Sequence, residues 1–224
     1  DQQVAALLAE LGEDTAVFVV SDHGAKKMEG GVCINEWLLR EGYLRLAEPV
    51  SGVTPIAKAT IDWSKTVAWG EGGYYSRIFL NVRDREPQGV VPPEEYEAVR
   101  EELRRKLEAM RDEQGQLLGT RAYRPQEIYR SVRGVPPDLV VLFGDLNWRS
   151  VGSLGLGTIL TYENDTGPDD ANHSRHGIFI YRESGGPAGK WLEGLSLLDI
   201  APTILSKFGL PVPGDMQGKP IPLE

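Results

Sequence analysis

The strongest constraint on the fold is a short apolar run at residues 16–20 that follows directly on an amphipathic segment. Val4, Leu7 and Leu11 recur at helical spacing and Gly12 ends the pattern, which predicts a helix over residues 1–12. Residues 16–20 are continuous, apolar and rich in β-branched side chains, which predicts a buried parallel strand. A helix, a short loop and a buried strand in this order indicate an α/β fold.

The alternation of short apolar runs and helical patterns continues along the chain. Three more strands are predicted, over residues 77–82, 139–143 and 177–181, the last two of them buried. Three more helices are predicted, over residues 34–40, 94–114 and 196–208. The last helix begins with Ser196 and Asp199 in capping-box spacing. We therefore expect a core sheet from residues 1–39 and 136–224, with an inserted α+β cap subdomain over residues 40–135.

Composition narrows the function classes. The chain has 224 residues, of which 41% are hydrophobic and 25% charged, as in ordinary globular proteins. Its apolar runs are far shorter than the roughly 20 residues of a membrane span, so no membrane contact is expected. A net charge of −9 argues against broad nucleic-acid binding. It does not exclude a small anionic substrate, because a bound metal reverses the local field.

Cysteine usage and the start of the chain bear on its compartment. Cys33 is the only cysteine, so no internal disulfide can form, and we interpret it as a small buried apolar residue. This composition fits a reducing compartment, and the chain shows no signal peptide. We expect a cytoplasmic protein whose sequence here begins after its native start.

The first candidate site is Ser21-Asp22-His23-Gly24, directly after the first predicted strand. Ligands of open α/β sheets bind at the carboxyl ends of strands. A carboxylate and an imidazole at such an end suit a divalent metal, and Gly24 permits the turn that brings both to one ion. The alternative is that Asp22 caps a helix and His23 makes a local hydrogen bond.

The second candidate site is the polar stretch of residues 164–177, which leads into the last predicted strand. His173 is suited to be a third metal ligand. The acidic residues of the stretch, Asp165, Asp169 and Asp170, are candidates for contact with a metal or its ligands. The alternative is a solvated acidic loop, and His176 is interpreted as structural.

Several of these stretches resemble signatures of one enzyme family. Residues 18–24, Phe-Val-Val-Ser-Asp-His-Gly, resemble a hallmark of the alkaline phosphatase superfamily, in particular its type I phosphodiesterase/nucleotide pyrophosphatase branch. Residues 173–180 resemble the later His motif of that branch, and residues 199–219 resemble its C-terminal signature. Other stretches resemble a subgroup of predicted phosphohydrolases or phosphomutases, namely residues 35–38, 61–65, 72–75, 77–81 and 164–170.

The resemblance implies a fold, cofactors and site residues. The fold would be an alkaline-phosphatase-like three-layer sandwich, of which this chain forms the C-terminal part. The family implies two divalent metal ions, usually zinc, and a Ser or Thr nucleophile. Manganese stays an alternative, because sites of nitrogen and oxygen ligands accept both metals. Asp22 and His23 match two ligands of one metal, and His173 matches a ligand of the other. Two such ions stabilise the attacking and leaving oxygens at phosphorus, and a covalent phospho-enzyme forms.

The resemblance also implies missing parts. The family places its nucleophile and further metal ligands before the strand that ends in Asp22, and only twenty-one residues precede Asp22 here. We therefore expect the C-terminal part of a hydrolase of small phosphorylated substrates, inactive and weakly metal-binding by itself. The alternatives are a phosphomutase of the same superfamily and a non-catalytic binding module. The sequence leaves the substrate and the oligomeric state open.

Other residues have a functional and a structural interpretation. Lys26 and Lys27 are candidates for phosphate attraction or for a solvated loop. Arg77 is a candidate for a substrate anion or for a surface ion pair. Five aromatic residues are candidates for a substrate pocket or, as the default, for packing: Trp63, Trp69, Tyr74, Tyr75 and Trp148.

Overall fold

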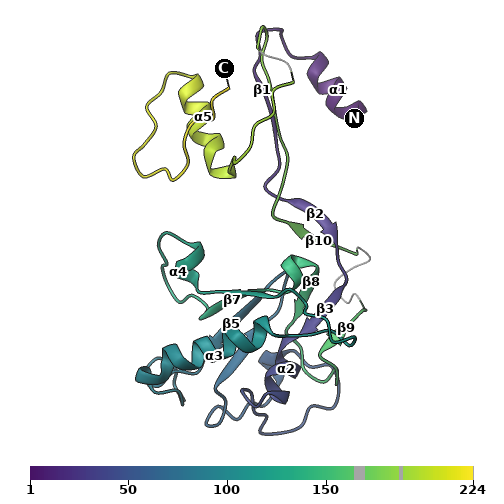
Figure 1. The fold of residues 1–224 in the computed structure, drawn as a ribbon, viewed down its shortest axis with the longest axis vertical. Helices are drawn as coiled ribbons and strands as arrows, with labels where there is room; N and C mark the ends of the chain where they lie inside the picture. Colours follow the sequence, from purple (N-terminus) through teal and green to yellow (C-terminus); the bar gives the residue numbers. More distant parts are fainter. Residues whose placement is uncertain (164–169, 187–188, 224) are drawn as a thin grey trace. The chain divides into compact units, whose positions relative to one another are not determined.

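The computed structural model of the chain describes residues 1–163, 170–186 and 189–223 (Figure 1). The chain divides into two compact units, one made of residues 1–24 with 175–224 and the other of residues 25–174. We call them the terminal unit and the central unit. Each contains helices and strands, which confirms the predicted α/β class.

The central unit contains a four-stranded antiparallel sheet in the order β4-β5-β7-β6. Its strands are β4 (Ala68–Glu71), β5 (Ser76–Leu80), β6 (Arg121–Tyr123) and β7 (Leu139–Leu142). The strands predicted over residues 77–82 and 139–143 are confirmed as β5 and β7, and β7 is buried at its first three positions. The strand β7, which we assigned to the core sheet, is hydrogen-bonded to β5 and β6 of the proposed cap. The cap boundaries themselves stay a prediction.

Two smaller sheets complete the strands of the central unit. Strand β3 (Gly30–Cys33) pairs in parallel with β8 (Trp148–Val151) and antiparallel with β9 (Leu160–Thr161). A Cβ at Gly30 would lie 2.4 Å from the Thr161 carbonyl oxygen, so only glycine lets these backbones approach so closely. Strand β2 (Gly24–Lys27) pairs with β10 (Ala171–Ser174) in a separate two-stranded sheet.

Two helices supply most of the helical packing in the central unit. Helix α2 (Ile34–Arg40) has the bounds predicted for it. Helix α3 (Tyr96–Glu108) ends before the predicted residue 114, because the Asp112 carboxylate accepts hydrogen bonds from two later amides and organises a turn. The short helices are η1 (Ile56–Lys58), η2 (Pro93–Glu95), α4 (Pro125–Ile128) and η3 (Gly144–Leu146). None of the helices within the described ranges is long and apolar enough to cross a membrane.

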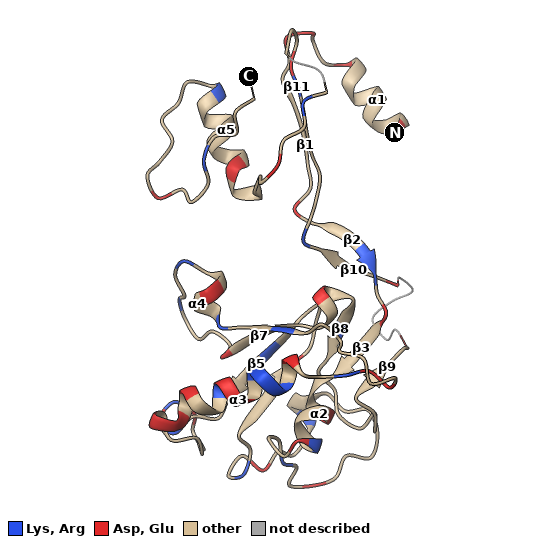
Figure 2. Cartoon of the chain, in the orientation of Figure 1, with Lys and Arg blue, Asp and Glu red and all other residues tan. Residues whose placement is uncertain are grey.

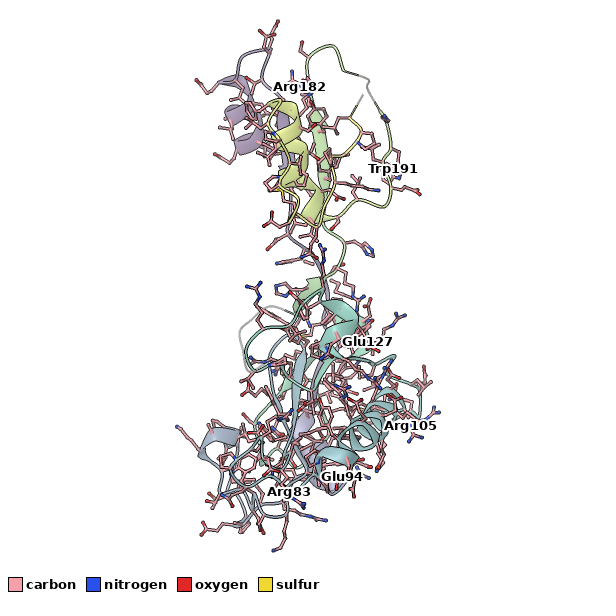
Figure 3. The ribbon with its side chains drawn as sticks, turned by 90° about the vertical axis from the view of Figure 1, so that its left-hand side faces the viewer. Arg83, Glu94, Arg105, Glu127, Arg182 and Trp191 are labelled. Carbon is pink, nitrogen blue, oxygen red and sulfur yellow. The ribbon has the colours of Figure 1, made fainter. Side chains whose placement is uncertain are left out.

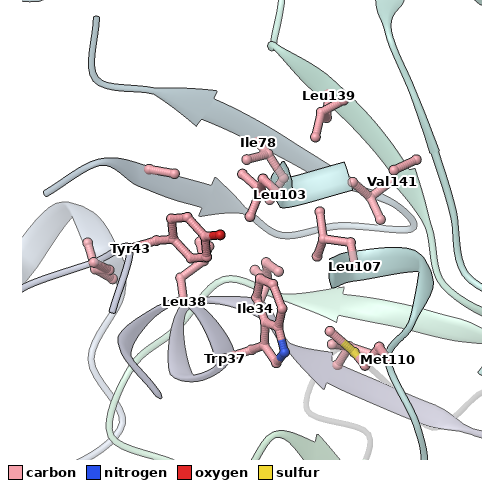
Figure 4. Packing of buried hydrophobic residues seen from close by; sticks show 14 of the residues in the cluster. Ile34, Trp37, Leu38, Tyr43, Ile78, Leu103, Leu107, Met110, Leu139 and Val141 are labelled. Atoms are coloured by element: carbon pink, nitrogen blue, oxygen red, sulfur yellow. The ribbon is translucent and has the colours of Figure 1, made fainter. Parts of the chain in front are cut away.

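The core of the central unit lies between these helices and the four-stranded sheet (Figure 4). Leu38 of α2, Ile78 of β5, Leu103 and Leu107 of α3 and Leu139 of β7 are all fully buried. Each such side chain contributes about 1.5–3 kcal/mol by leaving water. The opposite face of α3 is charged, with Arg104 paired to acidic residues of α3 and α4 (Figure 2). The predicted amphipathic helix therefore packs as its pattern indicated.

A buried carboxylate ties the sheet to α3. Asp138, only 3% exposed, accepts the backbone N–H of Leu80 at 2.6 Å and both guanidinium NH groups of Arg85 at 2.8 and 2.7 Å. It also accepts the hydroxyl of Tyr96 at 2.7 Å. Burial and this hydrogen bond raise the pKa of Tyr96 to about 12. The network satisfies a charge that would be costly to bury alone.

The terminal unit is built around a two-stranded antiparallel ribbon. Strand β1 (Val17–Val20) pairs with β11 (Phe179–Arg182), with Val17 opposite Arg182 and Val20 opposite Phe179. The prediction of a parallel, buried strand at residues 16–20 is therefore wrong in both respects. The predicted burial of residues 177–181 is wrong too, because Ile178 and Ile180 are more than half exposed. A ribbon of two strands cannot bury both of its faces without further layers.

Several apolar residues of the terminal unit stay in contact with water. Helix α1 (Gln2–Ala9) contains no buried residue. Trp191, labelled in Figure 3, is 85% exposed. Helix α5 (Ile200–Lys207) follows η4 (Leu197–Asp199), where the predicted capping box of Ser196 and Asp199 is confirmed. Lys207 of α5 pairs with Glu183 at 2.7 Å, just after β11.

Candidate metal centre

The candidate Asp-His pair lies in the turn that follows β1. Ser21 extends the pairing of β1, since its backbone N–H donates to the Ile178 carbonyl at 3.1 Å and its hydroxyl accepts the Ile178 N–H at 2.8 Å. A Cβ at Gly177 would lie 2.4 Å from the Ser21 hydroxyl oxygen, so glycine is needed there. The strand therefore ends in an anchored serine, and Asp22 and His23 follow at its carboxyl end as predicted.

Local hydrogen bonds orient both side chains of the pair. Asp22 Oδ1 accepts the backbone N–H of His23 at 3.0 Å, which leaves Oδ2 directed elsewhere. His23 Nδ1 lies 2.9 Å from the Gly24 carbonyl oxygen. Because a carbonyl can only accept, Nδ1 is the donor of this hydrogen bond, and Nε2 carries the lone pair when the ring is neutral. His23 Nε2 lies 3.6 Å from Asp22 Oδ2.

This arrangement fits two ligands of one divalent ion. Zinc bonds of about 2.0–2.1 Å at a tetrahedral angle place two ligand atoms roughly 3.3 Å apart. The separation of 3.6 Å between Nε2 and Oδ2 is close to that value. Ligating histidines commonly donate their other ring N–H to a backbone carbonyl, as His23 does to Gly24. The local hydrogen bond expected under the alternative interpretation is thus present and compatible with metal binding.

His173 lies on β10 of the central unit. Its side chain is half-buried, and its backbone N–H donates to Asn172 Oδ1 at 2.8 Å. Its imidazole packs against the Tyr74 ring with 3.9 Å between centroids and 60° between planes. The partner strand of β10 is β2, which begins at Gly24, the residue after His23.

The structure brings two of the three predicted ligands together. Asp22 and His23 converge in the terminal unit, and His173 belongs to the central unit, which is described separately. No group of three or more His, Cys, Asp or Glu side chains suited to hold a metal ion occurs within the described ranges. Asp165 and Asp169 lie outside the described residues, and Asp170 is exposed. His176 is exposed too.

The basic residues singled out in the sequence have protein partners. Lys26 lies on β2 and donates to the Asp145 carbonyl oxygen at 2.9 Å, and Lys27 pairs with Glu29 at 3.1 Å. Both therefore lie on a strand and not in the loop that we expected. Arg77 pairs with Glu71 at 2.6 Å, which is the ion pair given as one of its two interpretations.

Most of the aromatic candidates pack within the central unit. Trp69 contacts Trp63 edge-on at 5.1 Å between centroids and stacks on Phe79 at 5.4 Å. Trp148 is 8% exposed and belongs to the core. Tyr74 and Tyr75 are the exceptions, with 58% and 40% exposed. Cys33 is fully buried, as expected of a small apolar residue.

Sequence reasoning missed the role of Asn172. Its side chain is 3% exposed, and its Nδ2 lies 3.5 Å from the Tyr74 carbonyl oxygen, which it meets as a donor. It thus links the chain beside His173 to the loop between β4 and β5. A buried asparagine directly before a candidate ligand was the available signal, but its partner is 98 residues away.

A comparison with models of protein families gives the family of the chain. The family model for Type I phosphodiesterase / nucleotide pyrophosphatase matches residues 1–178. The chain belongs to this family. The matched range includes Asp22, His23 and His173, the three predicted ligands. A search of curated proteins found no match to the chain.

Membership of the type I phosphodiesterase family gives the superfamily and the reaction class of the chain. The family lies in the alkaline phosphatase superfamily, and the mixed α/β architecture is consistent with an alkaline-phosphatase-like fold. It is a family of hydrolytic enzymes whose chemistry is phosphodiesterase- or pyrophosphatase-type phosphoryl transfer. The predicted family, superfamily and reaction class are therefore confirmed at that level.

Proposed function

We propose that this chain carries part of the two-metal centre of a phosphoryl-transfer hydrolase. The substrate would be a small phosphorylated molecule: a phosphodiester, a nucleotide pyrophosphate or a phosphomonoester. The observation that carries the proposal is the convergence of His23 Nε2 and Asp22 Oδ2 to 3.6 Å at the end of β1. The family match over residues 1–178 supports the reaction class.

In this proposal Asp22 and His23 hold one divalent ion and His173 is a ligand of the other. When bound, the two ions supply positive charge to the attacking and leaving oxygens at phosphorus. Carboxylate and imidazole donors accept zinc and manganese alike, and zinc is our first choice. A chain with a net charge of −9 needs such local positive charge to bind an anion.

The residues of this chain act by holding donors in place. The Gly24 carbonyl fixes the ring proton of His23 on Nδ1, and the His23 amide fixes the Asp22 carboxylate through Oδ1. These contacts restrict both side chains before a metal binds. Ser21 stabilises the strand end that presents both residues.

We further propose that the nucleophile, a Ser or Thr hydroxyl, and the remaining ligands lie upstream of residue 1. The hydroxyl loses its proton to solvent and its oxygen attacks phosphorus, while the leaving oxygen departs with the electrons of its bond to phosphorus and takes up a proton. Water then attacks phosphorus, the bond to the Ser or Thr oxygen breaks, that oxygen takes a proton from the water, and the phosphate product is released. On this proposal, the 224-residue chain alone is inactive.

The test is an assay of the protein expressed from its own start codon. Hydrolysis of p-nitrophenyl phosphate and bis-p-nitrophenyl phosphate would be measured with zinc or manganese, for the unmodified protein and for Asp22→Ala, His173→Ala and His176→Ala. We expect the first two variants to lose activity by at least 100-fold, since a ligand is removed. The matched control His176→Ala keeps it. Unchanged activity in Asp22→Ala and His173→Ala would contradict the assignment.

A further inference from the structure

We propose that the loop between β4 and β5 positions His173, with Tyr74 as the residue that fixes the orientation of its imidazole. The inference rests on the proposed function, because that function makes the orientation of His173 matter. It concerns a residue that the metal ligands themselves do not include. Tyr74 acts through His173 and is a positioning residue.

The loop that carries Tyr74 is held by hydrogen bonds and close backbone contacts. Gly73 exchanges two backbone hydrogen bonds with Ser150 of β8, at 2.9 and 2.8 Å. A Cβ at Gly72 would lie 2.5 Å from the Gly152 nitrogen, so the two backbones touch. The buried Asn35 amide donates to the carbonyl oxygens of Gly70 and Gly152 at 2.8 and 2.7 Å. The loop is therefore held against β8 on both sides of Gly72.

A buried side chain connects this loop to the strand of His173. Asn172 accepts the His173 N–H at 2.8 Å through Oδ1 and meets the Tyr74 carbonyl oxygen at 3.5 Å through Nδ2. With 3% of its surface exposed, Asn172 exchanges these partners with water only at a cost. The side-chain amide of Asn172 thus bridges the backbone carbonyl of Tyr74 and the backbone N–H of His173.

The Tyr74 ring makes the final contact. Its centroid lies 3.9 Å from that of the His173 ring, although 58% of the tyrosine is exposed. An aromatic residue left so exposed gains little from burial, and its imidazole contact is the ring contact that the structure gives it. A ring at this separation restricts rotation of the imidazole about its Cβ–Cγ bond. Tyr74 therefore lowers the conformational cost of His173 binding a metal.

The experiment is an NMR titration of the protein expressed from its own start codon, with its histidines labelled with carbon-13 at Cε1. The unmodified protein, Tyr74→Ala, Tyr74→Phe and the neighbouring control Tyr75→Ala would be compared, with His173→Ala to assign the resonance. Without metal, Tyr74→Ala should shift the His173 Cε1–H resonance because it loses the tyrosine ring current. Tyr74→Phe and Tyr75→Ala should leave it near its original position. Amide spectra of each variant establish that the fold is retained.

Zinc is then added to each sample and the dissociation constant is read from the His173 resonance. Removal of an outer contact of a ligand typically costs about 10-fold or more in metal affinity, which we expect for Tyr74→Ala. Tyr74→Phe should restore the affinity, since the ring and not the hydroxyl makes the contact. Equal affinity in Tyr74→Ala and the unmodified chain would overturn the positioning role, as would a Tyr74→Phe variant as weak as Tyr74→Ala. If zinc leaves the His173 resonance of the unmodified chain unmoved, the proposed ligand role of His173 fails first, and the inference fails with it.

Discussion

Helices α3 and α1 are both amphipathic by sequence, yet they meet different surroundings. Leu103 and Leu107 of α3 are fully buried in the central unit, whereas Leu7 of α1 is 66% exposed in the terminal unit. The same contrast separates β7, which is buried between β5 and β6, from the half-exposed ribbon of β1 and β11. An apolar pattern therefore reports that a segment can be buried, and neighbouring layers decide whether it is buried.

The comparison extends to function. The central unit is stabilised by a dense core and by the Asp138 network. The terminal unit carries the Asp22-His23 pair, whose side chains are exposed to water. Segments with few buried contacts open at low free energy, and binding sites are often found in them. We expect mutations to affect global stability strongly in the central unit and weakly in the terminal unit.

The largest difference between the two units is expected when the same substitution is made in both helices. Leu107→Ala removes a fully buried side chain and should lower the free energy of unfolding of the central unit by about 2–5 kcal/mol. Leu7→Ala, at an exposed position of the terminal unit, should change the free energy of unfolding of that unit by less than about 0.5 kcal/mol. Urea unfolding followed by tryptophan fluorescence measures both. Similar losses in the two variants would remove the distinction between the units.

A second substitution tests the polar part of the central unit. Asp138→Ala leaves the Leu80 N–H and the Tyr96 hydroxyl without this acceptor. Arg85 loses its contacts with Asp138 and keeps those with Glu86 and the Leu80 carbonyl. Because Arg85 remains partly in water, we expect a loss of about 2–3 kcal/mol, below the value for a fully buried pair. The matched control is Asp62→Ala, which breaks a pair with Lys65, whose side chain is 72% exposed, and a hydrogen bond from Ser64; it should cost about 1 kcal/mol. The same urea titration compares the two, and equal losses would contradict the role of the network.

The smallest effect is expected at Asp199 in the terminal unit. Hydrogen bonds from the backbone N–H groups of Lys219 and Ser196 hold the pKa of Asp199 below its ordinary value. A lowered pKa gives stability that is present above the unfolded pKa of about 3.9 and is lost as pH falls through the folded pKa. Asp199→Asn should remove about 1 kcal/mol of local protection and abolish this acid dependence.

Amide hydrogen exchange of Lys219 and Ile221, corrected for intrinsic rates, measures this protection between pH 6 and pH 3. Lys219 reports on the carboxylate directly. Ile221 is the reference for the same segment, because its N–H donates to the Thr203 hydroxyl, which donates to the backbone carbonyl of Asp199 and not to its carboxylate. Protection that is independent of pH in the unmodified chain would show that the Asp199 carboxylate does not hold the C-terminal segment.

Local patterns in the sequence were sufficient for much of the fold. The bounds of α2, the stripe of α3 and the capping box before α5 follow from residues within a few positions of one another. The pairing of β1 could not be predicted, because an apolar run does not encode its partner strand or its direction. The early end of α3 depends on one competing carboxylate, Asp112, which periodicity does not weigh.

The candidate site was likewise predictable in its local motif and not in its long-range contacts. The order of strand, Asp22, His23 and Gly24 indicated a metal ligand pair at a strand end, and that local order is what the structure shows. The contact of His173 with Tyr74 was not predictable, since the two residues are far apart in the sequence. The family resemblance predicted the ligands, and the structure gave the contacts on which the proposed positioning role rests.

The most direct test of the account is the metal content of the protein expressed from its own start codon. After loading with zinc and removal of excess, metal per chain would be measured by inductively coupled plasma mass spectrometry for the unmodified protein, Asp22→Ala, His23→Ala and the control His176→Ala. We predict about two equivalents in the unmodified protein and in His176→Ala, and loss of about one in each of the other variants. Equal metal content in all four proteins would contradict the assignment of Asp22 and His23 as ligands.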